Sequence, residues 1–227
     1  MKIHQQAVID LFKGLRPGRL LDAGSGGDSI GKVLKGLGFD VVSLDLYEAP
    51  FLKESFVKAD LNTGLPFRQG VFDYVLCSES LQYLENHAAL IREFGRVVKP
   101  AGSVVLSMPN LLNAGSRLYF LQRGYYPHFK PVRTVMKKKE WDSVVYNAIS
   151  LVEVTELMKL GGFELTCLKA TKLKASGYPL YLLIRGMSRL GLLFEKNPQK
   201  RELVSRLTSK ETLLGDHLII KFTLAAS

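Results

Sequence analysis

Cysteine is scarce in this chain, which has only two in 227 residues. Cys77 and Cys167 lie far apart, and neither belongs to a Cys-x-x-Cys or Cys/His cluster. This scarcity excludes a disulfide framework and gives no support to a structural zinc site. We therefore expect a reducing compartment and no metal ligand set.

Long apolar runs are also lacking. A bilayer-spanning helix needs about 20 apolar residues, and the nearest candidate, residues 178–194, contains two arginines. The N-terminal segment, residues 1–21, is interrupted by charges before any apolar run reaches the length of a signal peptide, so it predicts a short amphipathic helix. These patterns favour a soluble, cytoplasmic protein.

Acidic residues are fewer than basic ones, 21 against 31, which gives a formal charge of +10. Such an excess suggests an anionic partner, either nucleic acid, a phospholipid surface or a phosphorylated substrate. Residues 1–110 contain twelve acidic and twelve basic side chains, so the whole excess lies in residues 111–227. The hydrophobic content of 47% and the length are ordinary for one globular domain.

Short apolar runs bounded by turn residues alternate with segments of helical periodicity. The predicted strands are 19–23, 40–46, 56–59, 71–77, 103–108, 163–170 and 217–225. The predicted helices are 30–37, 88–98 and 151–160, with Lys99–Gly102 ending the second. This order is typical of a doubly wound α/β fold with a mostly parallel sheet, in which ligands bind at the carboxyl ends of the strands.

The first predicted strand runs directly into a glycine-rich turn, residues 24–27. Glycine allows a tight turn from strand to helix and lets a ligand approach main-chain N–H groups. Three acidic side chains should converge on this turn, because each lies at or just after one of the first three strands: Asp22, Asp45 and Asp60.

Acidic side chains beside the turn favour some nucleotide-like ligands and disfavour others. A nicotinamide dinucleotide requires Gly-x-Gly-x-x-Gly, but the third position is Ser29, and carboxylates flank a loop that should receive a pyrophosphate. A P-loop is absent because no Gly-Lys-Ser/Thr follows. S-adenosylmethionine fits better, since its two cationic groups, ribose diol and adenine amine all suit carboxylate partners.

The sequence between residues 19 and 110 resembles the class I S-adenosylmethionine-dependent methyltransferases, in the small-molecule branch that contains quinone-pathway and glycan- or natural-product-tailoring enzymes. A weaker similarity covers residues 150–163. The motifs are LLDAGSGG (20–27), VVSLDL (41–46), KADL with LPF (58–61 and 65–67), FDYVLCSESLQYL (72–84) and REFGRVVKPAGSVVLSMPN (92–110).

The resemblance implies a Rossmann-like, seven-stranded sheet whose last strand is antiparallel, with helices on both faces. It also implies that the glycine-rich turn lies under the methionine portion of S-adenosylmethionine, that Asp45 binds the ribose hydroxyls, and that Asp60 faces the adenine. The full implied set is Asp22, Gly24, Ser25, Gly26, Asp45, Leu46, Asp60, Leu61 and Ser78.

One departure from the family concerns catalysis. Many relatives have Glu-His where this chain has Gln82-Tyr83, so a catalytic histidine cannot be assigned at this position. Methylation of a hydroxyl needs a general base. Tyr83 and His128 are the candidates, with Tyr125 and Tyr126 near the second, and the catalytic residue stays unassigned.

Two of the acidic residues also have a simpler interpretation. Asp45 could stabilise a turn or cap a helix, and Asp60 could close an Asx turn with Asn62. Asp22 is harder to explain in this way, because an acid at the buried end of an apolar strand is costly without a partner. Both interpretations stay open at this point.

We expect one methyltransferase domain over residues 1–227, with additions on the acceptor side at 111–150 and 171–216, the latter mostly helical. The second addition contains an apolar helical face: Leu180, Leu183, Ile184, Met187, Leu190 and Phe194. It is either a lid helix packed on the core with solvated charges, or a basic amphipathic helix on an anionic membrane that reaches a lipid-linked acceptor.

The expected function is O-directed methyl transfer from S-adenosylmethionine to a small-molecule or lipid-linked acceptor, such as a sugar or an isoprenoid. Methylation of RNA is an alternative, but nucleic acid is disfavoured because no recognised RNA-binding module accompanies the basic half. A non-catalytic module that binds S-adenosylmethionine is a further alternative. The oligomeric state is not predicted.

Overall fold

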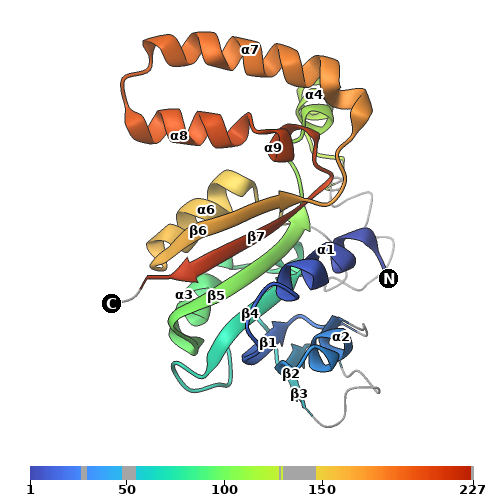
Figure 1. Ribbon diagram of the computed structural model, residues 1–227, viewed down its shortest axis with the longest axis vertical. Coiled ribbons are helices and arrows are strands. Elements are labelled where there is room, and N and C mark those ends of the chain that lie inside the picture. The colour runs from blue at the N-terminus through green and yellow to red at the C-terminus, as the bar shows by residue number, and fades with distance from the viewer. Residues whose placement is uncertain (27–29, 48–54, 128, 130–146, 226–227) are drawn as a thin grey trace.

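A seven-stranded sheet forms the centre of the molecule (Figure 1). The computed structural model describes residues 1–26, 30–47, 55–127, 129 and 147–225. The strands are β1 (Arg19–Ala23), β2 (Asp40–Asp45), β3 (Phe56–Lys58), β4 (Phe72–Ser78), β5 (Val98–Pro109), β6 (Phe163–Ala170) and β7 (His217–Leu224). Their order is β3-β2-β1-β4-β5-β7-β6, and β7 is antiparallel to both of its neighbours. The doubly wound α/β fold with an antiparallel last strand is therefore confirmed.

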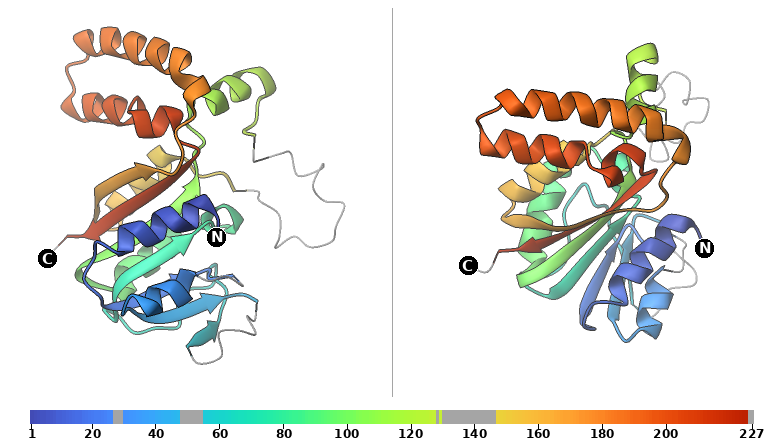
Figure 2. Two further views of the ribbon diagram at one scale, coloured as in Figure 1. Left: turned by 45° about the vertical axis from the view of Figure 1, so that its right-hand side comes forward. Right: turned by 45° about the horizontal axis from the view of Figure 1, so that its top comes forward.

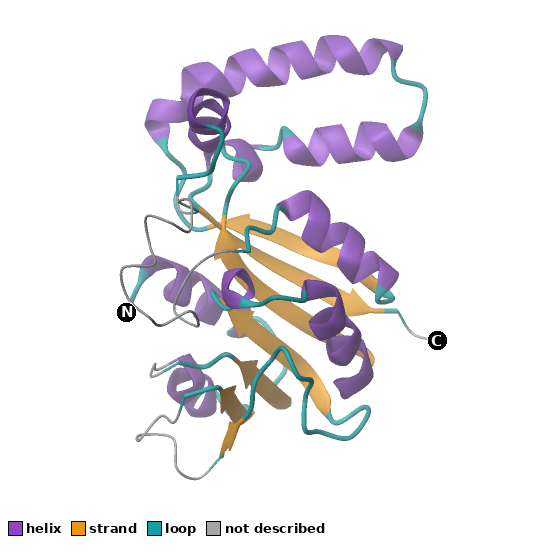
Figure 3. Cartoon of the chain, turned by 180° about the vertical axis from the view of Figure 1, so that it is seen from behind, coloured by secondary structure: helices purple, strands orange, loops and turns teal. Residues whose placement is uncertain are grey.

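Helices cover both faces of this sheet (Figures 1 and 3). They are α1 (Ile3–Phe12), α2 (Ile30–Gly36), α3 (His87–Val97), α4 (Ala114–Arg123), α6 (Leu151–Leu160), α7 (Tyr178–Phe194), α8 (Pro198–Leu207) and α9 (Lys210–Leu214). Two short 3-10 turns, η1 (Leu81–Tyr83) and η3 (Ala175–Gly177), complete the described elements. Helices α1 and α2 pack on one face through one apolar cluster, and α3 and α6 pack on the other through a second.

Helix α3 shows how the sequence produces this packing. The side chain of Asn86 accepts a hydrogen bond from the N–H of Ala89, which caps the first turn. The apolar positions that follow recur at helical spacing and are all buried: Leu90, Ile91, Phe94 and Val97. Each such side chain contributes about 1.5–3 kcal/mol when it leaves water.

Helix α3 ends at Val97, so Lys99–Gly102 lie just beyond its end, as predicted. Strand β5 begins at Val98, earlier than the predicted residue 103, and includes these four residues. They form an irregularity opposite Asp73, with Ala101 at a φ of 59°. The Lys99 ammonium lies 2.8 Å from an Asp73 carboxylate oxygen and holds this irregularity in place. The contact joins two segments 26 residues apart, so no local pattern announces it.

Helices α7, α8 and α9 form the predicted helical insertion between β6 and β7. They stand at the edge of the sheet where the parallel strands end (Figures 1 and 2). Helix α7 packs on α9 through Tyr181 and Ile184. Of the rest of the predicted apolar face, Leu180 is half-buried, whereas Leu183, Met187, Leu190 and Phe194 are exposed. The interpretation as a lid helix packed on the core was therefore wrong for these four exposed residues. Among the described residues, no helix is both long and apolar enough to cross a bilayer.

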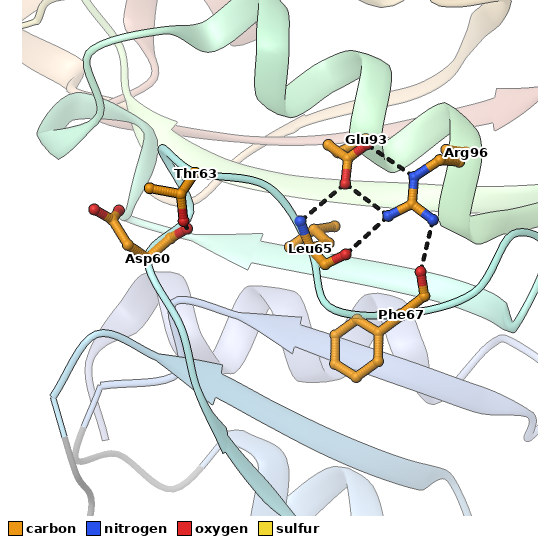
Figure 4. A network of polar contacts seen from close by, with 6 residues as sticks. All are labelled: Asp60, Thr63, Leu65, Phe67, Glu93 and Arg96. Atoms are coloured by element: carbon orange, nitrogen blue, oxygen red, sulfur yellow. Dashed lines mark hydrogen bonds and ion pairs between the residues drawn. The ribbon is translucent and has the colours of Figure 1, made fainter.

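Two side chains of helix α3, which form an ion pair with each other, hold the loop after β3 through hydrogen bonds (Figure 4). Arg96 and Glu93 form a salt bridge at 2.7 Å. The Arg96 guanidinium also donates hydrogen bonds to the carbonyl oxygens of Phe67 and Leu65, at 2.6 and 2.8 Å. Glu93 accepts a hydrogen bond from the N–H of Leu65 at 2.8 Å. Because Asp60 lies at the start of the same loop, this clamp helps to position it.

We predict that Glu93→Gln lowers the free energy of unfolding by about 1–3 kcal/mol at neutral pH, because it removes a charged hydrogen-bond partner. The hydrogen bond from Arg96 is the main cause that lowers the pKa of Glu93. The stabilisation is therefore complete above the ordinary glutamate pKa and is lost as the pH falls through the lowered one. Urea unfolding as a function of pH measures this difference.

The matched control is Arg92→Ala, an exposed substitution on the same helix, which should change the free energy of unfolding very little. A Glu93→Gln effect that stays constant down to strongly acidic pH would contradict the assignment to the ion pair.

Candidate functional site

A pocket of about 630 Å³ opens where the parallel strands end. This volume is ordinary for a small-molecule or cofactor site. The pocket is lined by all nine residues of the predicted binding set: Asp22, Gly24, Ser25, Gly26, Asp45, Leu46, Asp60, Leu61 and Ser78. Tyr83 lines it as well, whereas His128 lies outside the described residues. The structure thus brings the set together, and the binding roles remain predictions.

The turn after β1 is held against the end of β2. The N–H groups of Gly24 and Ser25 both donate to the carbonyl oxygen of Leu44, at 2.8 and 3.1 Å. Gly24 has a φ of +82°, and a Cβ on it would lie 2.2 Å from the Ser80 hydroxyl oxygen. That hydroxyl donates to the Gly24 carbonyl at 3.1 Å. Glycine is therefore required here both by the backbone conformation and by the close approach of Ser80.

Asp45 joins the ends of the first two strands. One of its carboxylate oxygens accepts a hydrogen bond from the N–H of Gly26 at 2.8 Å, and the other accepts from the N–H of Tyr47 at 3.0 Å. The simpler interpretation of Asp45 as a turn-stabilising residue thus describes part of what it does. Each carboxylate oxygen has two acceptor sites, so both oxygens retain capacity for donors of a ligand.

Asp60 forms the Asx turn that the sequence left open. Its carboxylate accepts hydrogen bonds from the main-chain N–H of Asn62 at 2.8 Å and from the Asn62 side-chain amide at 3.1 Å. The Asn62 side-chain oxygen in turn accepts from the N–H of Glu85 at 2.8 Å. The turn therefore ties the loop after β3 to the segment after β4, and Asp60 still lines the pocket.

Asp22 is the most buried acid of the pocket, with 3% of its surface exposed. It lies beside Gly31 of α2, where a Cβ would be 3.4 Å from the Asp22 carboxylate. Cys77 lies nearby on β4. Burial, with a smaller contribution from the charge of Asp22, raises the pKa of the Cys77 thiol to about 12. That thiol stays protonated at neutral pH and serves as a packing residue.

Two buried side-chain atoms at the pocket have no hydrogen-bond partner within the described residues: the Ser25 hydroxyl oxygen and the Gln82 carbonyl oxygen. An unsatisfied buried polar atom costs about 1–3 kcal/mol. Both residues line the pocket. A ligand with N–H or O–H donors would remove this cost, so the two atoms fit a polar ligand such as S-adenosylmethionine.

Glu79 is the first residue after β4, and its backbone has an unusual conformation. Its φ is 56°, in the left-handed region that non-glycine residues rarely adopt. Burial opposes ionisation of Glu79, but hydrogen bonds from His217 and Ser107 outweigh it, so its pKa is lowered. His217 has a raised pKa, chiefly because it donates to Glu79. The two side chains lie beside the pocket, with Nε2 of His217 3.5 Å from Oε2 of Glu79.

Tyr83 lines the same pocket but is poorly suited to remove a proton. Burial, followed by the charge of Glu79, raises the pKa of its phenol. The phenol therefore stays protonated at neutral pH, where it can donate a hydrogen bond but cannot accept a proton readily.

Several lining residues have no counterpart in the predicted set. Helix α1 contributes His4 and Gln5, Lys2 directly precedes it, and the segment after β4 contributes Ser80. The amphipathic pattern of the N-terminal segment predicts the helix but not where it docks. Ser80 lies within the motif at residues 72–84, yet only the contact with Gly24 reveals its role.

Comparison with known proteins decides the family. The model of a family described as "Methyltransferase domain" matches residues 4–168. The chain belongs to this methyltransferase family. The predicted resemblance to class I S-adenosylmethionine-dependent methyltransferases is thereby confirmed.

Curated relatives of this methyltransferase include the ubiquinone biosynthesis O-methyltransferases of Pseudomonas aeruginosa and Aliivibrio fischeri. The first, from strain UCBPP-PA14, is 30% identical over 145 residues, which cover 55% of this chain and 62% of the relative. The second, from strain MJ11, is 26% identical over 146 residues, which cover 56% of this chain and 62% of the relative. The match thus spans less than two thirds of either relative's own length.

Solved structures share the fold of this methyltransferase. An S-adenosylmethionine-dependent methyltransferase from Mesorhizobium loti has a TM-score of 0.57 at 18% identity, covering 97% of both chains. Phosphoethanolamine N-methyltransferase 2 from Haemonchus contortus, in complex with S-adenosyl-L-methionine, has a TM-score of 0.55 at 18% identity. It covers 97% of this chain and 52% of that one. At such identities the likeness concerns the fold.

The close approach of Ser80 to Gly24 yields a prediction for the methyltransferase turn. Gly24→Ala should lower the free energy of unfolding by about 1–3 kcal/mol, because the new methyl group must displace Ser80. The loss should be smaller in a Ser80→Gly background, where both nearest atoms are gone. Urea unfolding of the two single variants and the double variant measures this coupling.

Gly26→Ala is the control, since Gly26 also has a positive φ but a Cβ there meets nothing within 4 Å. Its cost should therefore be the same in the wild-type background and in the Ser80→Gly background. An equal cost of Gly24→Ala in both backgrounds would show that Ser80 is not what excludes the side chain.

Proposed function

We propose that the protein is an S-adenosylmethionine-dependent O-methyltransferase that acts on a small-molecule or lipid-linked acceptor, such as a hydroxylated isoprenoid. The observation that carries the proposal is the convergence of Asp22, Asp45 and Asp60 on one pocket beside a glycine-rich turn. The family match supports methyl transfer, and the curated relatives support oxygen as the methylated atom.

Three groups of the pocket have the chemistry to hold S-adenosylmethionine. Asp22 and the turn at 24–26 suit the methionine portion, Asp45 with Leu46 the ribose diol, and Asp60 with the N–H of Leu61 the adenine. When bound, S-adenosylmethionine supplies a methyl group on a positively charged sulfur. The chain's own contribution is to orient both reactants and to exclude water, which suffices for much of the acceleration of such a displacement.

The acidic residues of the pocket also argue against a different cofactor. A nicotinamide dinucleotide would bring a pyrophosphate to a turn that has Asp22 and Asp45 on either side, which is electrostatically unfavourable. Methylation of RNA and a non-catalytic binding role remain alternatives, and each predicts a different outcome when acceptors are tested.

We predict that the wild-type protein binds S-adenosylhomocysteine in isothermal titration calorimetry and that Asp45→Ala weakens this binding at least about tenfold. A lost hydrogen bond to a charged group costs about 1.5–3 kcal/mol, and about 1.4 kcal/mol corresponds to a factor of ten. NADH should give no binding heat under the same conditions.

Asp40→Ala is the matched control. Asp40 is the first residue of β2, at the end of the strand away from the pocket, and its side chain is 72% exposed. Its affinity for S-adenosylhomocysteine should equal that of the wild type. If only NADH binds, the proposed function fails, and an unchanged affinity in Asp45→Ala would remove Asp45 from the site.

The proposal extends to where the acceptor is met. Six exposed apolar side chains lie on α7, with exposed fractions of 59–86%: Leu182, Leu183, Met187, Leu190, Leu193 and Phe194. The α7–α8 segment, residues 178–207, contains six basic and two acidic residues. Helix α4 lies close to the start of α7 in both views of Figure 2 and adds exposed Leu118 and Leu121. An apolar face bordered by positive charge suits the surface of an anionic bilayer.

We therefore infer peripheral binding of the α7 face to an anionic membrane, through which a lipid-linked acceptor would be reached. Flotation with vesicles of phosphatidylglycerol and phosphatidylcholine should recover the protein, and raised ionic strength should reduce the recovery. The double variant Met187→Glu and Leu190→Glu should lose binding, because it places charge on the inserted face.

Leu160→Glu is the control, because Leu160 is 85% exposed at the end of α6, and α8 lies between α6 and α7 (Figure 1). It should float like the wild type. Absence of binding to anionic vesicles at low ionic strength, or equal loss in the control, would refute the membrane surface without affecting the cofactor site.

A further inference from the structure

Three side chains with metal-binding atoms meet at the edge of the pocket. They are His4 of α1, Glu79 after β4 and His217 at the start of β7, and one ligand atom from each lies within 4.8 Å of the others. Nε2 of His217 is 3.5 Å from Oε2 of Glu79. The rings of His4 and His217 are stacked, with centroids 5.2 Å apart. The three come from distant parts of the chain and meet only in the fold.

The remaining polar atoms of Glu79 and His217 are held by other residues. The Ser107 hydroxyl donates to Oε1 of Glu79 at 2.7 Å, so Oε2 is the oxygen directed at His217. Nδ1 of His217 lies 3.4 Å from a carboxylate oxygen of Asp216, so Nε2 is the nitrogen directed at Glu79. Asp216 is fixed in turn by Lys174 at 2.6 Å.

This arrangement is the one that metal ligands in proteins commonly have. A coordinating histidine usually donates its second ring N–H to a carboxylate or carbonyl, and a coordinating carboxylate is itself hydrogen-bonded. Here Asp216 and Ser107 occupy these two supporting positions. The cluster is also accessible, because the Glu79 and His217 side chains are each 22% exposed and both His4 and Glu79 line the pocket.

The backbone supports the same conclusion. Glu79 adopts a φ of 56°, a conformation that is unfavourable for a non-glycine residue and persists where the surroundings enforce it. Its N–H donates to the carbonyl of Ser107 at 2.8 Å, the residue whose hydroxyl holds its side chain. Strand β5 thus fixes both the backbone and the carboxylate of Glu79 in the direction of the two histidines.

We propose that His4, Glu79 and His217 bind a divalent transition-metal cation at the edge of the pocket. Two imidazoles and one carboxylate suit zinc, iron or manganese, and three protein ligands leave further coordination positions open. An open position beside the pocket can accept an oxygen of the acceptor and favour its deprotonation. This consequence rests on the proposed function, whereas binding of the cation does not.

The test uses the full chain, freed of metal by a chelator and then dialysed, without S-adenosylmethionine or acceptor. Titration with zinc(II) or manganese(II) chloride should show one saturable cation per chain in calorimetry, and cobalt(II) should give visible absorption bands of a bound ion. His4→Ala, Glu79→Gln and His217→Ala should each weaken binding at least about tenfold. Ser107→Ala should weaken it by about 10–100-fold, as loss of a supporting contact does.

His87→Gln is the control, because His87 is a buried histidine whose ring bonds the Leu81 carbonyl and lies outside the cluster. It should bind the cation like the wild type, and circular dichroism should show that all variants are folded. His4→Ala is the most informative variant, since its partial exposure on α1 makes unfolding the least concern.

No saturable binding of any of the three cations, or equal affinity in His4→Ala and the wild type, would overturn the proposal and leave the cluster as a set of polar contacts within the fold. Because neither cofactor nor acceptor is present, this failure is distinct from failure of methyl transfer. If the wild type does not bind S-adenosylhomocysteine, the proposed function is refuted, but the proposed cation site is not.

Discussion

The hydrogen bond from the N–H of Gly26 to the carboxylate of Asp45, at 2.8 Å, couples the two parts from which the pocket is built. It fastens the turn after β1 to the end of β2, and the N–H groups of Gly24 and Ser25 add two bonds to Leu44 on the same strand. Strand order and turn conformation are therefore fixed together. With both fixed, the acidic residues at the ends of the parallel strands lie together at the same end of the sheet. The turn also requires the positive φ of Gly24.

The molecule divides its chemistry between two regions. The cofactor half is neutral overall but presents carboxylates to the pocket, whereas the excess of basic residues lies in the second half. Helix α7 carries exposed apolar side chains beside positive charge at the same edge of the sheet. Under the proposed function, a polar, cationic cofactor and an apolar acceptor in an anionic membrane would approach one pocket from different sides. The cluster of His4, Glu79 and His217 lies where α1, the end of β4 and the start of β7 meet.

Much of the sheet could be predicted because its strands are short apolar runs bounded by turn residues, and β1 and β6 have the expected bounds. The acidic positions followed from the rule that parallel strands end at one edge. Contacts between distant residues could not be predicted. The start of β5 at Val98 rather than at residue 103 could not be predicted, because the irregularity at Lys99–Gly102 depends on Asp73. The sequence left open whether the α7 face packs on the core, and in the structure Tyr181 and Ile184 pack against α9. His4 and His217 lie at opposite ends of the sequence, where no spacing relates them.

The central claim is that this pocket transfers a methyl group to the oxygen of a small or lipid-linked molecule. The most direct test is incubation of the protein with methyl-labelled S-adenosylmethionine and one of two acceptors. The first acceptor is a hydroxylated isoprenoid aromatic compound in anionic vesicles, and the second is total cellular RNA. We expect label in the lipid fraction as a methyl ether, at a rate that depends on the protein. Label in the RNA, or no transfer to either acceptor from a protein that binds S-adenosylhomocysteine, would contradict it.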